Sequence, residues 1–368
     1  METNRITQQR VHWNAAQDKT MFLRLPLKER ERRWLTEQLE VLSVKEQYQL
    51  AAAIRNTEQL RELAGKTGLE LSAAILSRKP EVTVEAINCF LNLHDYEVCF
   101  PAGSYEELGR YHLTYESGAV DDVRPFLDME QLGRRCAELH PGCFLDDCYV
   151  RHPQREMQPI YDGQTLPAAE AMDWSLRLKL ASPAVPEGVW LRLPDDAEVL
   201  DFRPDEISMA LHALQASSIR ECTLLDARCV LPEIRNLMDE YDNLEDLVRD
   251  GNNLGYLLEE QGQGMPHFLE RFRGALALEQ CESLSMALEI GQNLRCYDFI
   301  PQKDIEAVSR EATSEDPLVS ECLDHAAYGA YLLEQQGYQQ TDSGAYIRRN
   351  EQLLQWEHNP APMEMTTL

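Results

Sequence analysis

The segment LHDYEVCFP at residues 93–101 returns in altered form as LRCYDFIP at residues 294–301. Each copy is followed at the same spacing by a second matched segment, YEELG at 105–109 and IEAVS at 305–309. Self-similarity over such an interval is typical of chains that contain one structural unit more than once. We therefore expect two related units in this sequence.

Three further matches occur in the same order along the chain. They are FLRLP (22–26) with WLRLP (190–194), FLDMEQLGRRCAEL (126–139) with CLDHAAYGAYLLEQ (322–335), and CYV (148–150) with AYI (345–347). The interval between partners grows from 168 residues for the first pair to about 200 for the later ones, which predicts that the second copy is longer.

The repeat and the composition together predict five parts. They are a helical N-terminal segment at 1–80 that is near-neutral to basic, a first α+β unit at 81–152, a Pro- and Ala-rich linker at 153–186, a second, longer acidic unit at 187–350, and a flexible tail at 351–368.

The apolar periodicity predicts an α+β, predominantly helical fold, in an elongated chain of subdomains that joins small sheets to helices. In the first half we expect helices at 27–41, 44–63, onward to 92, 104–116 and 128–139, and strands at 96–100 and 144–151. In the second half we expect strands at WLRLP and 221–231, helices at 231–241, 243–260, 265–278 and 281–293, and then the same closing strand–helix–helix–strand order.

The charge of the chain is strongly negative, with 63 acidic residues against 35 basic ones and a formal net charge of −28. Its distribution is uneven: residues 1–80 carry 14 basic and 10 acidic residues, whereas residues 195–342 carry 10 basic and 31 acidic residues. Solubility alone is one explanation. Such a field repels phosphates, so we do not expect direct binding to nucleic acid.

Acidic residues crowd into predicted helices of both units. Carboxylates three or four positions apart on a helix stand about 5–6 Å from one another, a spacing of the same order as that of phosphates along DNA. We expect these acids to form a partner-binding surface. Its candidate residues are Glu106, Glu107, Asp121, Asp122, Asp128, Glu130, Asp239, Glu240, Asp242, Glu245, Asp246, Asp250, Glu259, Glu260, Asp304, Glu306, Glu315, Asp316, Glu321 and Asp324.

Motifs for catalysis or cofactor binding are missing from the sequence. It contains no phosphate-binding loop, nucleophile elbow, zinc helix or dinucleotide fingerprint. The set His140, Cys143, Cys148 and His152 has spacings that a zinc site could use, but the second copy does not repeat it, and core cysteines are the simpler interpretation. We expect no enzyme activity, no cofactor and no metal.

The same segments resemble the ArdA-type antirestriction proteins of conjugative elements and phages. The resemblance is to the long versions and rests on LHDYEVCFPAGSYEELGRYHLTYESGA (93–119) and PFLDMEQLGRRCAELHPGCFLDDCYV (125–150), and in the second copy on residues 247–279 and 321–347. The family commonly has Tyr-Gly-Arg-Asp after its Leu-Asp position. Here Arg135 and Tyr331 replace the final acid.

The resemblance implies a DNA mimic. Such a protein would occupy the DNA-binding groove of a host type I restriction–modification methyltransferase or its specificity complex, and members of the family usually do so as a homodimer. Two alternatives stay open: a decoy for another DNA-binding system, such as a CRISPR effector or a transcription regulator, and an acidic adaptor protein of a mobile element. With no apolar run long enough to span a membrane and no signal-like N-terminus, we expect a cytoplasmic protein.

Overall fold

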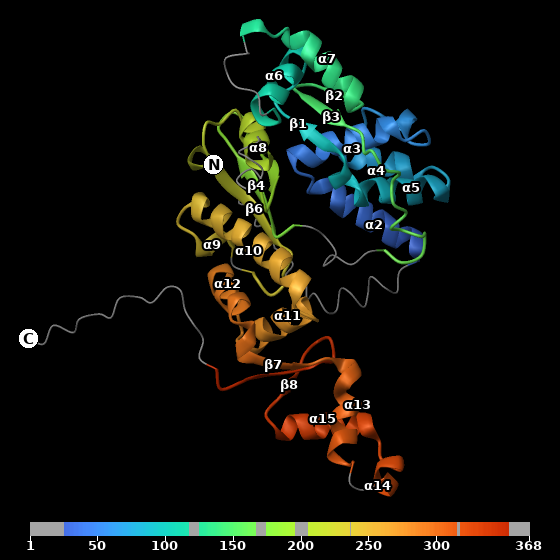
Figure 1. The fold of residues 1–368 in the computed structure, drawn as a ribbon, viewed down its shortest axis with the longest axis vertical. Coiled ribbons are helices and arrows are strands. Elements are labelled where there is room, and N and C mark those ends of the chain that lie inside the picture. Colours follow the sequence, from blue (N-terminus) through green and yellow to red (C-terminus); the bar gives the residue numbers. More distant parts are fainter. Residues whose placement is uncertain are drawn as a thin grey trace, which may run out of the picture. The chain divides into compact units, whose positions relative to one another are not determined.

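The computed structural model describes residues 26–117, 125–166, 174–195, 205–235, 237–314 and 317–352. The chain divides into two compact units, one formed by residues 1–168 with 197–209 and the other by residues 169–196 with 210–368. Helices predominate, and the strands form three small antiparallel sheets (Figure 1). The α+β, predominantly helical fold expected from the sequence is confirmed.

Unit 1 begins with a helical bundle. Its elements are α2 (Leu27–Glu40), α3 (Val44–Asn56), the 3-10 turn η1 (Arg61–Leu63), α4 (Gly68–Leu76) and α5 (Pro80–Leu91). Ser43 and Glu46 form a capping box that starts α3, with a 3.1 Å bond from the Glu46 N–H to the Ser43 hydroxyl. The buried side chains of these helices, such as Leu35 and Ile87, make one apolar core.

The first module follows the bundle and consists of a three-stranded sheet and two helices. Its elements are η2 (Leu93–Asp95), β1 (Glu97–Cys99), α6 (Tyr105–Tyr115), α7 (Met129–Leu139), β2 (Gly142–Leu145) and β3 (Cys148–Arg151). The strand order is β1-β3-β2. The single strand expected at 144–151 is therefore a hairpin, because Asp146 takes a left-handed conformation (φ 48°) and reverses the chain.

The expected linker at 153–186 contains ordered structure at both ends. Tyr161 is buried in unit 1, where its N–H donates to Asn88 Oδ1 at 2.7 Å and its hydroxyl donates to Glu31 at 2.8 Å. In unit 2, residues Leu176–Ala181 form β4, the central strand of a sheet in the order β5-β4-β6. The Pro and Ala content of this segment concealed a strand that pairs with the nearby β5 and with a second strand at residues 223–229.

Unit 2 begins with that sheet and continues as helices. The remaining strands are β5 (Val189–Arg192) and β6 (Thr223–Cys229); α8 (Glu206–Leu214) crosses the boundary of the two units, and η6 (Ile219–Glu221) precedes β6. The helices α9 (Leu237–Glu240), α10 (Leu244–Gly264), α11 (Phe268–Leu278) and α12 (Leu284–Gln292) then follow. Helix α10 contacts β4. The helix expected at 231–241 is confined to α9.

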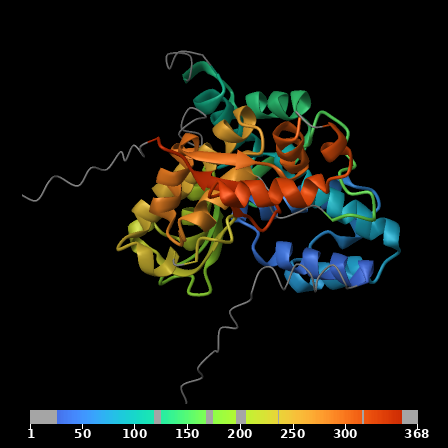
Figure 2. The same cartoon turned by 90° about the horizontal axis from the view of Figure 1, so that it is seen from below.

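The second module ends unit 2. Its elements are η7 (Leu294–Cys296), β7 (Tyr297–Ile300), η8 (Gln302–Asp304), α13 (Ile305–Ala312), α14 (Pro317–Glu321), α15 (His325–Gln335), β8 (Gln339–Gln340) and β9 (Tyr346–Arg349). The strand order is β7-β9-β8. Helices α13 and α15 pack side by side (Figures 1 and 2).

The two modules share their topology, so the sequence repeat corresponds to a structural one. Asp128 caps α7 and Asp324 caps α15, each accepting a backbone N–H at 3.0 Å. Five residues later, Gly133 and Gly329 bring the second helix against the carbonyl oxygens of Tyr105 and Ile305. The FLRLP copy of the first matched pair lies, apart from Pro26, outside the described residues.

Candidate acidic partner-binding surface

Helix α10 presents acids on one side and buries apolar residues on the other. Leu247, Val248 and Leu254 are buried, whereas Glu245, Glu259 and Glu260 are exposed. The helical spacing of the leucines in the sequence predicts this division, and the structure confirms it for the described side chains.

Four acids in this region have no ion-pair partner among the described residues. They are Asp239 on α9, Asp242 in the following turn, and Glu259 and Glu260 near the end of α10, and all four are exposed. We call them the open carboxylates. Because no described cation forms an ion pair with them, their charges act on the surface potential without a direct counterion from the described part of the chain.

The first two turns of α10 carry acids that are already paired. Glu245 bonds to Arg220 at 2.7 Å, while Asp246 and Asp250 share Arg249 at 2.7 and 3.3 Å. Asp250 also accepts a 2.8 Å bond from the Tyr241 hydroxyl. Burial and this bond raise the pKa of Tyr241 well above its ordinary value, so the phenol keeps its proton and stays a donor.

Glu240 has a structural role. Its carboxylate accepts the backbone N–H groups of Leu284 and Ser285 at 2.7 and 2.9 Å and the Ser285 hydroxyl at 2.8 Å. These are the unsatisfied donors at the start of α12, where a negative charge is stabilised by the helix dipole. Glu240 therefore joins α9 to the start of α12 and has a structural role.

The described candidate acids of the first module are exposed, but each already forms an ion pair or a hydrogen bond within the chain. Glu106 forms an ion pair with Arg110, and Glu130 forms one with Arg134 at 2.7 Å. Glu107 bonds to the Ser104 hydroxyl at 3.1 Å, confirming the predicted helix start. Asp128 is the cap of α7 described above. Asp121 and Asp122 lie outside the described residues.

The second module repeats part of this arrangement. Glu306 pairs with Arg310 at 2.8 Å, as Glu106 does with Arg110 at the equivalent positions. Asp304 and Glu321 are exposed and have no ion pair within the described ranges, whereas Asp324 caps α15. Glu315 and Asp316 fall in a stretch that the structure does not describe.

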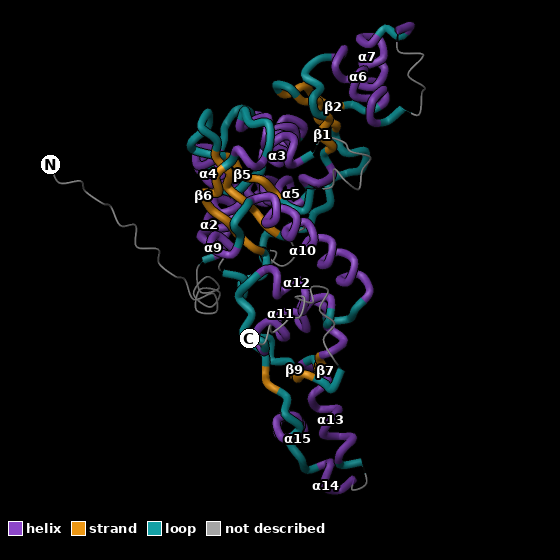
Figure 3. The backbone as a smooth tube through the Cα atoms, turned by 90° about the vertical axis from the view of Figure 1, so that its left-hand side faces the viewer, coloured by secondary structure: helices purple, strands orange, loops and turns teal. Residues whose placement is uncertain are grey.

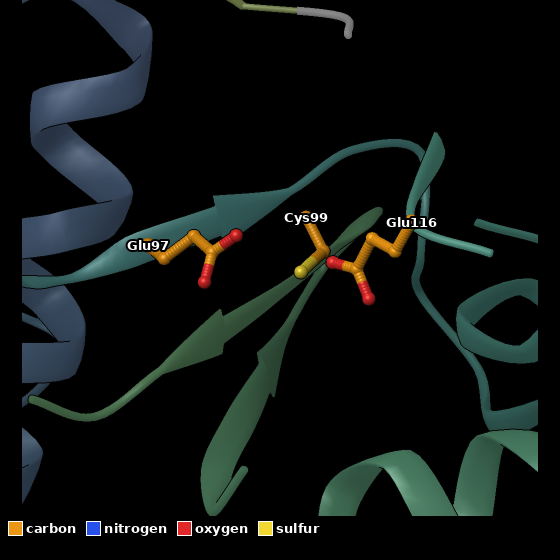
Figure 4. Close-up of side chains that lie close together, drawn as sticks. All are labelled: Glu97, Cys99 and Glu116. Atoms are coloured by element: carbon orange, nitrogen blue, oxygen red, sulfur yellow. The ribbon is translucent and has the colours of Figure 1, made fainter. Parts of the chain in front are cut away.

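One partly buried cluster, which runs from the exposed Glu97 to the buried Cys99, was not predicted. The side chains of Glu97, Cys99 and Glu116 lie close together (Figure 4), and each offers a ligand atom within 4.8 Å of those of the other two. Arg151 lies against the same group and donates to Glu97 and Glu116, each at 3.0 Å. The guanidinium thus supplies the positive charge that the two carboxylates require. The signal was present in the repeat, where Asp298 and Arg348 replace Glu97 and Arg151 at facing positions of β7 and β9.

The other possible metal ligands sit on or beside the hairpin. Cys148 is buried on β3, and burial raises its pKa to about 12, which keeps it a thiol. His140 has its Nδ1 3.4 Å from Gln154. Among the described residues, the Glu97 group is the one cluster close enough to share an ion.

Comparison with known proteins adds no relative. No protein-family model, no curated protein and no solved structure matches the chain. Among the described helices, none combines the length and apolar character that crossing a membrane requires.

Proposed function

We propose that this chain is a DNA mimic that occupies the DNA-binding groove of a type I restriction–modification enzyme, acting in the cytoplasm as a stoichiometric inhibitor and not as an enzyme. The observation that carries the proposal is the set of open carboxylates, Asp239, Asp242, Glu259 and Glu260. They are exposed, share one sign and are not neutralised by described neighbours.

The dimensions of α10 suit this role. Its 21 residues extend over about 31 Å at a rise of about 1.5 Å per residue, which is the axial length of about nine base pairs. Asp242 precedes the helix and Glu259 and Glu260 lie near its end. A basic groove shaped for a DNA segment can therefore meet negative charge at both ends of one rigid element.

The paired acids between those ends can join the surface when the partner binds. Glu245 with Arg220 and Asp246 with Arg249 are exposed ion pairs, and such pairs contribute roughly 0–1 kcal/mol. A lysine or arginine of the target can replace the intramolecular partner at little cost. The described ion pairs thus offset the local potential of these acids in the free protein without blocking the complex.

The duplication of the module supports the same function. Two modules in one chain provide in tandem what a dimer of a shorter protein would provide, and we propose that a single chain is sufficient to fill the groove. Sedimentation of the pure protein tests this point: an obligate homodimer would contradict it.

A competition experiment tests the function. A purified type I methyltransferase is bound to a labelled DNA duplex, and the chain is added over a series of salt concentrations. We expect displacement of the DNA at low salt, weakening as salt screens both charged surfaces. Failure to displace DNA at low salt would contradict mimicry and favour the adaptor alternative.

Two matched variants locate the working surface. The first replaces the open carboxylates, as Asp239→Asn, Asp242→Asn, Glu259→Gln and Glu260→Gln, which changes the net charge from −28 to −24. The control makes the same change in charge at paired acids of unit 1, with Glu37, Glu62, Glu70 and Glu138 each replaced by Gln. We expect at least about tenfold weaker inhibition from the first and little change from the control. Equal losses would assign inhibition to total charge.

A further inference from the structure

Unit 2 contains a hollow of about 710 Å³ that the acidic surface does not account for. It lies between the end of the β5-β4-β6 sheet and the helices α10 and α11, whose places are seen in Figures 1 and 3. Its walls are largely apolar and include Trp174, Pro194, Val230, Leu258, Met265 and Phe268. Its volume falls in the range of small-molecule sites, about 300–1,000 Å³.

Gly262 keeps one wall of this hollow open. Two other glycines of α10 are explained by close packing: a Cβ at Gly251 would lie 2.5 Å from Leu193, and one at Gly255 would lie 2.6 Å from Pro194. At Gly262 a Cβ would meet only Phe268, at 3.8 Å, which is an ordinary contact. A glycine there costs helix stability and packs against nothing closely. Its effect is to leave space beside Phe268.

The charged residues of the wall differ in burial. Arg192 and Arg273 are half-buried, whereas Glu259 and Glu270 are exposed. Glu270 is engaged with the His267 ring at 2.9 Å. Arg273 bonds through Nε to Glu233 at 2.9 Å. A guanidinium carries five donors in a planar fork, and its preferred partner is a carboxylate or another planar anion.

We propose that this hollow is a binding site for a small organic anion, a ligand with a flat apolar body and one carboxylate or sulfonate group. The apolar walls take the body. The half-buried Arg192 and Arg273 take the charge, since charges that are partly withdrawn from water are screened less by salt than the exposed acids are. This proposal does not rest on the proposed inhibition of a DNA-binding enzyme, although the rim of the hollow includes Glu259, one of the open carboxylates.

The test uses the full chain and the fluorescent probe 8-anilinonaphthalene-1-sulfonate, which has an aromatic body and one sulfonate. Titration should give saturable binding of one probe per chain. Gly262→Phe places a ring in the hollow, whereas Gly264→Phe places the same ring at an exposed position with no atom within 4 Å of its Cβ. We expect Gly262→Phe to weaken binding at least about tenfold and Gly264→Phe to change it less than about twofold.

A separate variant, Arg192→Gln, tests whether the hollow prefers anions. Arg192→Gln should weaken binding of the sulfonate probe by about fivefold or more and leave binding of the neutral dye Nile red unchanged. Melting curves of all three variants show whether they remain folded. Non-saturable binding to the native chain, equal behaviour of the two Phe variants, or an unchanged sulfonate affinity in Arg192→Gln would each overturn the proposal.

Discussion

Arg151 and Glu97 face each other across strands β3 and β1, and their side chains are joined by a 3.0 Å hydrogen bond. Arg348 and Asp298 stand in the same relation across β9 and β7, at 2.9 Å. The two pairs differ in burial, because the Arg151 side chain is 9% exposed and that of Arg348 is 37% exposed. Loss of the arginine should therefore cost more stability in the first module, where it is buried, than in the second.

Replacement of Arg151 by Met should destabilise the first module. Burial alone would raise the pKa of Glu116, but hydrogen bonds from Arg151 and His112 outweigh it and hold that pKa below its ordinary value. Without the arginine, a largely buried carboxylate loses its main partner, which costs about 3 kcal/mol. Urea unfolding at neutral pH measures the loss. Arg348→Met is the matched control and should cost less than about 1 kcal/mol.

The contact between Arg151 and Glu116 predicts that the stability of the chain depends on pH. A carboxyl whose pKa is lowered by folding contributes stability above its unfolded pKa and loses it as the pH falls through the folded value. The unfolded reference for Glu116 is 4.5. The stability difference between the native chain and Arg151→Met should therefore be full at neutral pH and shrink as the pH falls below about 4.5. A difference that stayed constant down to strong acid would show that Glu116 is not the group involved.

Gly133 and Gly329 should tolerate no side chain. A Cβ at either position would collide with a backbone carbonyl oxygen of the preceding helix, of Tyr105 in one module and Ile305 in the other. Backbone cannot move aside as a flexible side chain can, so we expect each Gly→Ala change to cost about 2–3 kcal/mol by forcing the helices apart. Denaturant unfolding measures the cost.

The control for these glycines is Gly262→Ala. Its Cβ would make only an ordinary 3.8 Å contact, and alanine is the better helix former, so the change should be neutral or stabilising by up to about 1 kcal/mol. Similar losses at all three glycines would mean that the helix-to-helix approach is not the cause.

Substitutions of the helix caps Asp128 and Asp324 can distinguish a role in the fold from a role as negative charges. Each accepts a backbone N–H at 3.0 Å at the start of its helix. Asp→Ala removes the acceptor and should cost about 1 kcal/mol at each site, whereas Asp→Asn keeps an acceptor and should cost much less. Thermal unfolding checks the difference. In the competition assay, inhibition lost by the Ala variants but kept by the Asn variants would mean that these acids act through the helix start.

Local features of the sequence predicted local features of the structure. The helices expected at 104–116 and 128–139 begin after Ser104 and Asp128, since a cap depends on residues three apart. The apolar stripe of α10 was visible for the same reason. Features that join distant segments were missed: β4 is the centre of its sheet because it also pairs with the strand at 223–229, and Arg151 meets Glu97 only through the strand register.

The sequence predicted which acidic residues belong to the candidate site, but not how they are arranged or which contacts they make. Counting acids could not distinguish Glu240, which caps α12, from Asp239 beside it, which has no ion-pair partner among the described residues. Nor could it show that Glu245 faces Arg220, because that contact spans a turn, a strand and a helix. The tertiary structure decides which acids form ion pairs or hydrogen bonds within the chain. These contacts in turn determine how many carboxylates remain available to a partner.

The ten cysteines should differ widely in reactivity. None forms a disulfide, and Cys322 is the one exposed thiol among them. Burial raises the pKa of Cys229 to about 12 and that of Cys89 and Cys281 to about 11, so these groups hold almost no reactive thiolate near neutral pH. Labelling of the native chain with N-ethylmaleimide, followed by peptide mapping, should modify Cys322 at least about tenfold faster than these three. Denatured protein provides the control, where all ten should react at similar rates. A buried thiol that reacted as fast as Cys322 in the native chain would indicate that its helix or strand opens readily, and would contradict the packing described for that unit.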